Sequence, residues 1–173
     1  MKHLGWIFTA LLLSFVMWKR VPELAKNFAA EGKPFPSSNL QNMDGSFVTF
    51  PEANGAPFTV VFWTRTCGPC KLEMERIQDS VANGKISPDR IVAIHIGGTP
   101  SEVKTHMDKY GFTFRSALDP DGIAAATLEV NLTPTIFLVS GDRKIAWASS
   151  GLGPTDVWRI EQHLKKQEKN TNP

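Results

Sequence analysis

The sequence is poor in the residues that build metal centres and disulfide scaffolds. Its 173 residues include only two cysteines and four histidines. The histidines, His3, His95, His106 and His163, are scattered and form no spaced pair. Structural zinc sites need about four ligands, usually with a second cysteine pair. We therefore expect no metal site, and the chain can form at most one internal disulfide.

Strong charge of either sign is also absent. The 19 basic and 17 acidic residues leave a formal net charge of +2, and no basic run carries interleaved aromatic residues. Because nucleic-acid-binding domains present a marked basic face, we expect no nucleic-acid partner. No flavin or nicotinamide motif occurs, so we expect no cofactor. The length, with 42% hydrophobic residues, suits one globular domain plus an extension.

The two cysteines lie at the junction of two predicted elements. Residues 58–63 form a continuous apolar, β-rich run, which is typical of a buried central strand. Cys67-Gly68-Pro69-Cys70 follows, and a helical pattern begins there, with Met74, Ile77 and Val81 on the same face as Cys70. Two intervening residues bring both sulfurs within disulfide reach. The arrangement is typical of a redox-active pair.

The position of each cysteine predicts its role. Cys67 is expected at the helix N-terminus, where unpaired backbone N–H groups and the helix dipole stabilise a thiolate. The thiolate is the attacking species in disulfide exchange, so Cys67 is the predicted nucleophile. Cys70 lies about one turn further on and is the predicted resolving cysteine. Arg65 is expected to add positive potential near Cys67.

Other interpretations of this pair stay open. Thr64-Arg65-Thr66-Cys67 has the Thr-x-x-Cys spacing of a thiol peroxidase, but Val60 stands where peroxiredoxins carry a proline. The cysteines could also be a buried, inert pair. In that case the chain would be a binding or chaperone module that keeps the disulfide as a clasp.

Strands alternate with helices along most of the chain. Met43-Asp44-Gly45-Ser46 is a turn signal between two strand-like stretches, so it predicts an N-terminal β-hairpin. Thr99 and Glu102 form a capping-box pattern with Pro100 at the first helical position. The alternation predicts an α/β sandwich with a central mixed sheet. Beyond the cysteine motif, the predicted strands are 90–96, 112–118, 135–139 and 144–149, and the predicted helices are 99–111, 123–130 and one that begins at 153–154.

The N-terminal segment is apolar from Leu4 to Trp18 and is followed by Lys19-Arg20. This run of fifteen residues is shorter than the about 20 that a membrane span needs, and no small-x-small cleavage site follows it directly. A cleaved signal peptide and a buried helix are the alternatives. We interpret the run as an uncleaved signal-anchor. The predicted boundaries are 1–20 for this anchor, 21–34 for a linker, 35–166 for the folded domain and 167–173 for a flexible tail.

A second motif, Thr133-Pro134-Thr135, precedes a predicted strand far from the cysteines. By itself it fits an ordinary trans proline at the start of a strand. Combined with Trp63 and Cys67-Gly68-Pro69-Cys70, however, it resembles the thioredoxin superfamily over roughly residues 34–164. The resemblance implies a thioredoxin-like three-layer sandwich in which a cis-Pro134 loop faces the cysteines. Trp63, Thr133 and Pro134 are then the expected substrate-binding residues.

Several features are similar to the TlpA/ResA-like branch of membrane-anchored bacterial thiol-disulfide oxidoreductases. They are the N-terminal apolar segment, the hairpin turn at 43–45, the extra segment 99–118 and the stretch 119–139. The resemblance implies a reductase of protein disulfides, anchored in the bacterial inner membrane with its catalytic domain in the periplasm or otherwise outside the cytoplasm. It implies apocytochrome c, in cytochrome c maturation, or oxidase-assembly proteins as candidate targets, and a membrane electron donor that re-reduces the chain.

The resemblance also indicates a residue for proton transfer. Thioredoxin carries a buried Asp two residues before the Trp of the motif, where this sequence has Val61. In the ResA-like pattern an acid lies three residues after the second cysteine, which here is Glu73. A partly desolvated carboxyl has a raised pKa, which suits proton exchange with a buried thiol. The alternative is a solvated surface glutamate. Thr66 replaces the Trp that thioredoxin carries beside its nucleophile, which opens the surface near Cys67.

Overall fold

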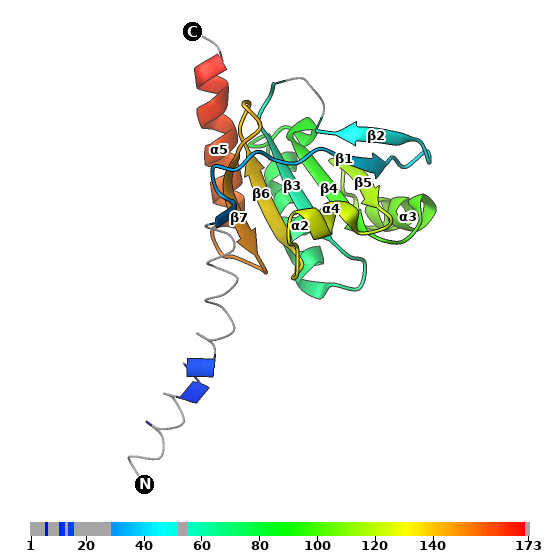
Figure 1. Cartoon of the computed structure of the whole chain (residues 1–173), viewed down its shortest axis with the longest axis horizontal. Coiled ribbons are helices and arrows are strands. Elements are labelled where there is room, and N and C mark those ends of the chain that lie inside the picture. The colour runs from blue at the N-terminus through cyan, green and yellow to red at the C-terminus, as the bar shows by residue number, and fades with distance from the viewer. Residues whose placement is uncertain (1–5, 7–10, 13, 16–28, 52–54, 172–173) are drawn as a thin grey trace.

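The computed structural model describes residues 29–51 and 55–171, with side chains through residue 166, together with residues 6, 11, 12, 14 and 15. A seven-stranded sheet with the strand order β2-β1-β5-β4-β3-β6-β7 forms its centre (Figure 1). The central strand β3 pairs in parallel with β4 and antiparallel with β6, so the sheet is mixed. The strands are β1 (Ser38–Gln41), β2 (Phe47–Phe50), β3 (Phe58–Trp63), β4 (Ile91–Ile96), β5 (Arg115–Asp119), β6 (Thr135–Val139) and β7 (Ile145–Ser150).

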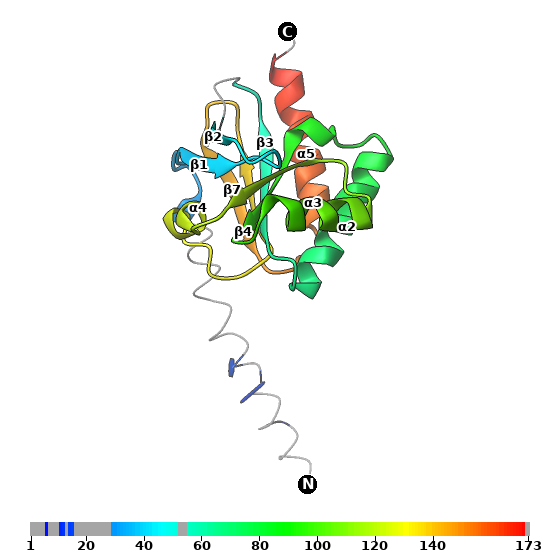
Figure 2. The same ribbon diagram turned by 90° about the vertical axis from the view of Figure 1, so that its right-hand side faces the viewer.

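Helices cover the two faces of this sheet unequally. Figure 2 shows α2 (Gly68–Ala82), α3 (Pro100–Tyr110) and α5 (Asp156–Thr171) on one face and the short α4 (Ile123–Thr127) on the other. A 3-10 turn, η1 (Pro88–Arg90), which the sequence did not predict, leads into β4. The expected α/β sandwich with a central mixed sheet is confirmed.

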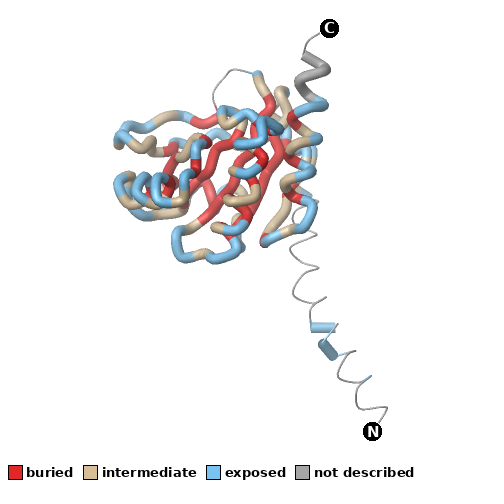
Figure 3. Tube along the Cα trace, turned by 180° about the vertical axis from the view of Figure 1, so that it is seen from behind, coloured by how far each residue is buried: buried red, intermediate tan, exposed pale blue. Residues whose placement is uncertain are grey.

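The alternation of side chains along β3 divides the core into two clusters. All six residues of β3 are buried, which fits the continuous apolar run. Val61 and Trp63 belong to the cluster under α2, α3 and α5, whereas Val60 and Phe62 belong to the cluster on the α4 face. This follows because successive side chains of a strand point to opposite faces. Figure 3 shows the buried strands running through the centre of the domain.

Most predicted elements are present, with shifts at some ends. The hairpin turns through residues 42–46, and α3 begins with the predicted capping box of Thr99 and Glu102. The helix α4 stops at Thr127 rather than at 130, because Glu129 adopts the left-handed region with φ of 53°. The last helix begins at Asp156 and extends past the predicted domain boundary at residue 166.

The chain before β1 lies along the outer edge of β7. The Gly32 N–H donates to the Ile145 carbonyl at 2.8 Å, and the Ile145 N–H donates to the Lys33 carbonyl at 2.9 Å. The Phe35 N–H donates to the Arg143 carbonyl at 2.7 Å. These bonds attach the segment that leads into the domain to an edge strand that would otherwise expose its polar backbone.

The predicted anchor at 1–20 and most of the linker at 21–34 lie outside the described residues. Among the residues that are described, no helix combines the length and the apolar character that a membrane crossing requires. The anchor, the linker, the tail and the domain boundaries therefore stay predictions.

Candidate redox site

The cysteine motif occupies the junction that the sequence predicted. β3 ends at Trp63, a short turn follows, and Cys67 is the N-cap residue of α2. Pro69 lies in the first turn of the helix, where its missing N–H group is not needed. The sulfurs of Cys67 and Cys70 are bonded at 2.07 Å, with their Cα atoms 5.2 Å apart. The only two cysteines of the chain thus form one disulfide.

The two sulfurs differ in access. Cys67 is half-buried, whereas Cys70 is 0% exposed. The Cys70 N–H donates to the Cys67 sulfur at 3.1 Å, as expected for a sulfur at a helix N-terminus. The Cys67 sulfur also lies 3.4 Å from the Thr133 carbonyl oxygen. Only Cys67 can therefore be reached by another protein without a rearrangement of the domain.

The Thr133-Pro134 loop lies beside the disulfide. The antiparallel pairing of β6 with β3 brings it there, although it is far away in the sequence. The Thr133–Pro134 peptide bond is cis, Pro134 is buried and Thr133 is half-buried. The Gly151 N–H donates to the Pro134 carbonyl at 2.7 Å, which joins this loop to the chain after β7.

Trp63 lies beneath this surface. Its side chain is 1% exposed, and its ring packs against the rings of His95 and His106 at centroid distances of 4.7 Å and 5.1 Å. Its indole Nε1 has no hydrogen-bond partner among the described residues. Trp63 is thus placed to support the turn before Cys67 from below, and a direct contact with substrate stays a prediction.

Glu73 is buried in the same helix, one turn beyond Cys70. The residue is 0% exposed, so the alternative of a solvated surface glutamate is wrong. Its Oε2 accepts a bond from Arg76 at 2.9 Å, and its Oε1 has no partner among the described residues. Burial raises the pKa of Glu73 to about 7, against the opposing effect of the Arg76 charge. This carboxyl can therefore gain or lose a proton near neutral pH.

Arg76 and Asp156 complete a polar cluster behind the disulfide. Arg76 donates to the carbonyls of Gly153 and Pro154 at 2.9 Å and 3.0 Å, which joins α2 to the start of α5. Asp156 is 2% exposed and accepts a bond from the Gly153 N–H at 3.0 Å. Burial raises the pKa of Asp156, and its charge in turn raises the pKa of Glu73.

The Arg65 side chain forms an ion pair with Glu102 near the cysteine turn. Its guanidinium donates to the Glu102 carboxylate at 2.9 Å, and both side chains are well exposed. Glu102 also accepts a bond from the Thr99 N–H at the start of α3. Part of the positive potential that the sequence suggested is therefore compensated, and Arg65 connects the cysteine turn to α3.

Sequence reasoning did not assign roles to His95, Arg76 or Asp156. Arg76 could have been found, because it lies one helical turn after Glu73 and residues at this spacing are neighbours. Asp156 follows the helix-opening Gly153-Pro154 pair, but only the folded chain brings it near Glu73. His95 ends a predicted buried strand, and nothing in its local sequence indicates what its ring contacts.

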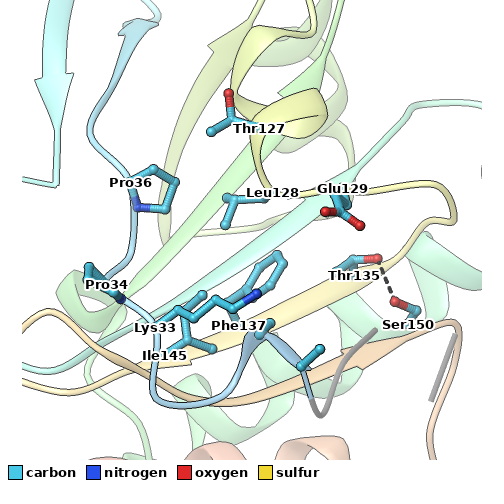
Figure 4. Close-up of a pocket in the computed structure, with 12 residues that line it drawn as sticks. Lys33, Pro34, Pro36, Thr127, Leu128, Glu129, Thr135, Phe137, Ile145 and Ser150 are labelled. Atoms are coloured by element: carbon cyan, nitrogen blue, oxygen red, sulfur yellow. Dashed lines mark hydrogen bonds between the residues drawn. The ribbon is translucent and has the colours of Figure 1, made fainter. Parts of the chain in front are cut away.

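A cavity of about 250 Å³ lies on the other face of the sheet. Figure 4 shows it between residues 33–36, the end of α4 and the strands β6 and β7, with Phe137 and Ile145 among its apolar lining. The hydroxyls of Thr135 and Ser150 are hydrogen-bonded at its margin. Neither cysteine lines it, so disulfide chemistry does not take place there. In the described part of the chain, no three His, Cys, Asp or Glu side chains are grouped so that they could hold a metal ion.

Comparison with known proteins agrees with this geometry. The sequence model of the Redoxin family matches residues 30–164. The thiol-disulfide oxidoreductase ResA of Bacillus subtilis (strain 168) is 27% identical over 126 residues, which cover 73% of this chain and 70% of that protein. A thioredoxin-like protein of Haemophilus influenzae is 25% identical over 162 residues, covering 93% of this chain and 87% of that protein.

Two solved structures share the fold. StoA from Bacillus subtilis has a TM-score of 0.60 at 20% identity, covering 75% of this chain and 96% of StoA. A thiol:disulfide interchange protein of the thioredoxin family from Chlorobium tepidum TLS has a TM-score of 0.61 at 19% identity, covering 78% of this chain and 95% of that one. The cysteine pair at a helix start, the neighbouring cis-proline loop and the matched family together identify the chain as a member of the Redoxin family, and within the thioredoxin superfamily as a TlpA/ResA-like thiol-disulfide oxidoreductase.

Proposed function

We propose that the chain reduces disulfides in other proteins, with Cys67 as the attacking residue and Cys70 as the resolving residue. One observation carries this assignment. The accessible sulfur of Cys67 accepts the backbone N–H of Cys70 at the start of α2, while the second sulfur is fully buried. A sulfur at a helix N-terminus is stabilised as a thiolate, and the thiolate is the nucleophile in disulfide exchange.

The proposed reaction begins with the reduced dithiol. The Cys67 thiolate attacks one sulfur of the target disulfide, and the other target sulfur leaves as a thiolate. Cys70 then loses its proton and attacks the Cys67 sulfur of the mixed disulfide, which expels the second target sulfur as a thiolate. The target gains two electrons, and the chain ends with the Cys67–Cys70 disulfide that the structure contains. A further dithiol or membrane electron donor has to reduce it again.

Glu73 is the proposed acceptor of the Cys70 proton. It lies one turn further along α2, is shielded from water and keeps one carboxylate oxygen free of hydrogen bonds among the described residues. Its pKa of about 7 suits this step, because a general base works best when its pKa lies near the working pH.

The Thr133-Pro134 loop is the proposed contact for the target chain, together with the turn above Trp63. Thr133 places its carbonyl oxygen 3.4 Å from the Cys67 sulfur. An extended segment that binds beside Cys67 would meet the main chain of this loop, and main-chain contacts can form with a segment of any sequence. Recognition of this kind suits a reductase with several protein targets.

The proposed location and natural targets are supported by the sequence and by the similarity to the family. We propose that residues 1–20 anchor the chain in the bacterial inner membrane, with the catalytic domain in the periplasm or otherwise outside the cytoplasm. The support is the apolar run from Leu4 to Trp18 with flanking charges. Apocytochrome c is the proposed target class, in cytochrome c maturation, on the basis of similarity to the ResA-like branch.

Insulin reduction tests the central proposal. The wild-type protein, supplied with a small dithiol, should accelerate the reduction of insulin disulfides, and Cys67→Ser should reduce the rate to that of the dithiol alone. A reduction potential above about −300 mV should accompany this activity, since structural disulfides lie below that value. A Cys67→Ser variant with wild-type activity would show that Cys67 is not the attacking residue. A wild-type protein with a lower potential and no activity would favour the alternative of an inert clasp in a binding module.

A further inference from the structure

The turn that carries Cys67 is held from the neighbouring strand by a histidine. This turn, residues 64–66, joins β3 to α2 and belongs to neither element. Within the turn, the Cys67 N–H donates to the Thr64 carbonyl at 3.2 Å. The Arg65 N–H donates to a residue outside the turn, the Nε2 atom of His95, at 3.1 Å. His95 lies in β4, so this bond ties the turn to a central strand of the sheet.

The surroundings of His95 fix which of its nitrogens carries a proton. The Nδ1 atom lies 2.7 Å from the Gly97 carbonyl oxygen. A carbonyl only accepts, so Nδ1 must donate and therefore carries the hydrogen. The Nε2 atom is then the free acceptor that the Arg65 N–H requires. Both nitrogens are thus satisfied in the neutral ring, in one tautomer.

The ring itself has little room to move. His95 is 4% exposed, and its ring lies edge-on to Trp63 at a centroid distance of 4.7 Å. Gly97 has φ of 71°, a conformation that favours glycine and accompanies the turn of its carbonyl toward the ring. A Cβ atom at Gly98 would lie 3.3 Å from the His95 Cε1 atom, so glycine also permits the close approach there.

Burial and the Arg65 charge favour the neutral ring as well. Burial is the largest cause of the lowered pKa of His95; the hydrogen bond to the Gly97 carbonyl raises this pKa, the Arg65 charge lowers it, and the Glu102 charge raises it, with a net downward shift. His106 on α3 also has a lowered pKa, so no second positive imidazole is expected beside it at neutral pH. Protonation of His95 would set an N–H at Nε2 against the Arg65 N–H, and the bond would be lost.

We propose that His95 is a positioning residue, which holds the Arg65 amide through Nε2 and thereby places Cys67 at the start of α2. This inference rests on the proposed role of Cys67. The held amide belongs to Arg65, two positions before Cys67, so a shift of the turn changes the 3.1 Å contact between the Cys67 sulfur and the Cys70 N–H. It also changes the position of the sulfur relative to the Thr133 carbonyl.

Two variants separate the hydrogen bond from the packing. His95→Phe keeps a flat ring against Trp63 but removes both polar contacts, whereas His95→Gln retains an acceptor that can reach the Arg65 N–H. In His95→Phe we expect the pKa of the Cys67 thiol to rise and the rate with oxidised glutathione to fall about tenfold, as for one lost positioning bond. In His95→Gln both should return most of the way to the wild-type values.

His163→Phe is the matched control. His163 is half-buried, and its Nε2 atom lies 3.1 Å from the Val139 carbonyl, away from the cysteines. Its replacement should leave the pKa of the Cys67 thiol unchanged. If His95→Phe and His95→Gln both keep the wild-type pKa and rate, or both lose the same amount, the positioning role is wrong.

Nitrogen NMR of the wild-type protein tests the contact without any variant, so a variant that does not fold leaves the test intact. We expect the His95 shifts of a ring protonated at Nδ1, and a coupling across the bond between the Arg65 nitrogen and the His95 Nε2. A ring protonated at Nε2 at neutral pH would overturn the inference. Failure of the proposed function is a different result, because the wild-type protein would then not react with oxidised glutathione, whatever the state of His95.

Discussion

The surroundings of Cys67 and of Cys70 are built from different parts of the fold. Around Cys67 lie loops and main-chain groups, namely the turn after β3, the Thr133 carbonyl and the exposed start of α2. Behind Cys70 lie side chains of two packed helices, with Glu73 and Asp156 buried and Arg76 partly exposed beside them. Generic polar groups thus face the partner, and specific titratable groups face the interior.

This difference separates two tasks that a dithiol has to perform. The outer sulfur must be ionised and accessible before a partner arrives, and helix geometry alone favours this. The inner sulfur must stay protonated until the mixed disulfide forms, and then must lose its proton without help from water. In the proposed mechanism, the buried Glu73 carboxyl with its raised pKa accepts this proton. The experiments below test whether the two regions act in this divided way.

The largest expected effect comes from replacing one cysteine at a time by serine. The reduced Cys70→Ser variant should accumulate a stable mixed disulfide with a partner protein that carries a disulfide, since the resolving sulfur is gone. Cys67→Ser should accumulate none, because the remaining sulfur is fully buried. Non-reducing gel electrophoresis and mass spectrometry of trapped partners provide the measurement. Equal trapping by both variants would show that the two sulfurs are not divided as proposed.

Loss of the Glu73 carboxyl should slow the second step. In the wild-type protein, the rate at which Cys70 resolves the mixed disulfide should rise with pH through about 7, as Glu73 becomes a carboxylate. Glu73→Gln should lower this rate about a hundredfold at pH 7 and remove that rise, the usual scale for general base catalysis. Glu75→Gln, which removes a half-exposed carboxylate paired with Lys71, is the control and should behave as wild type. Stopped-flow measurement of the release step provides the comparison.

Glu73→Gln should slow the release step but increase the stability of the folded protein. The pKa of Glu73 is raised on folding from 4.5 to about 7, so between these values the folded state binds the proton that the unfolded state has lost. The free energy of unfolding therefore falls as pH rises through this window. Glu73→Gln removes the loss, and it should stabilise the oxidised protein at pH 8 by up to about 3 kcal/mol. At pH 4 little gain should remain. Urea unfolding at pH 8 and at pH 4 measures this difference. An equal change in the free energy of unfolding at both pH values would contradict a raised pKa of the buried Glu73.

The smallest expected effect concerns Asp156. Its charge raises the pKa of Glu73, so Asp156→Asn should move the pH profile of the release step to lower pH by about half a unit. The amide can still accept the Gly153 N–H, which preserves the start of α5. Asp121→Asn, at an exposed turn, is the control. If Asp156→Asn leaves the pH profile of the release step unchanged, Asp156 does not influence the pKa of Glu73 and has only a structural role.

The parts of the fold predicted from the sequence are those that local patterns determine. The continuous run at 58–63 predicted the buried β3, and the capping box predicted the start of α3. The disulfide followed from spacing within one turn. In contrast, α4 is shorter than predicted because Glu129 adopts a left-handed conformation, which its residue type does not indicate.

The contacts that tune the site are long-range, and for this reason the sequence did not show them. Glu73 was identified by resemblance, but its raised pKa comes from burial in the folded chain and from the charge of Asp156, which lies far away in the sequence. His95 meets Arg65 only because β4 lies beside β3 in the sheet. Residue spacing within a sequence predicts contacts inside one helix or strand, so it predicts neither of these contacts between elements.

The bonds between residues 32–35 and the strand β7 have a mechanical consequence. A force that pulls on the chain from its N-terminal side loads the main-chain hydrogen bonds of Gly32, Lys33 and Phe35 to Ile145 and Arg143. These bonds lie at the edge of the sheet, whereas β3, which leads into the cysteine turn, lies inside it. We therefore expect such a force to act on the edge of the domain before it changes the distances around the two sulfurs.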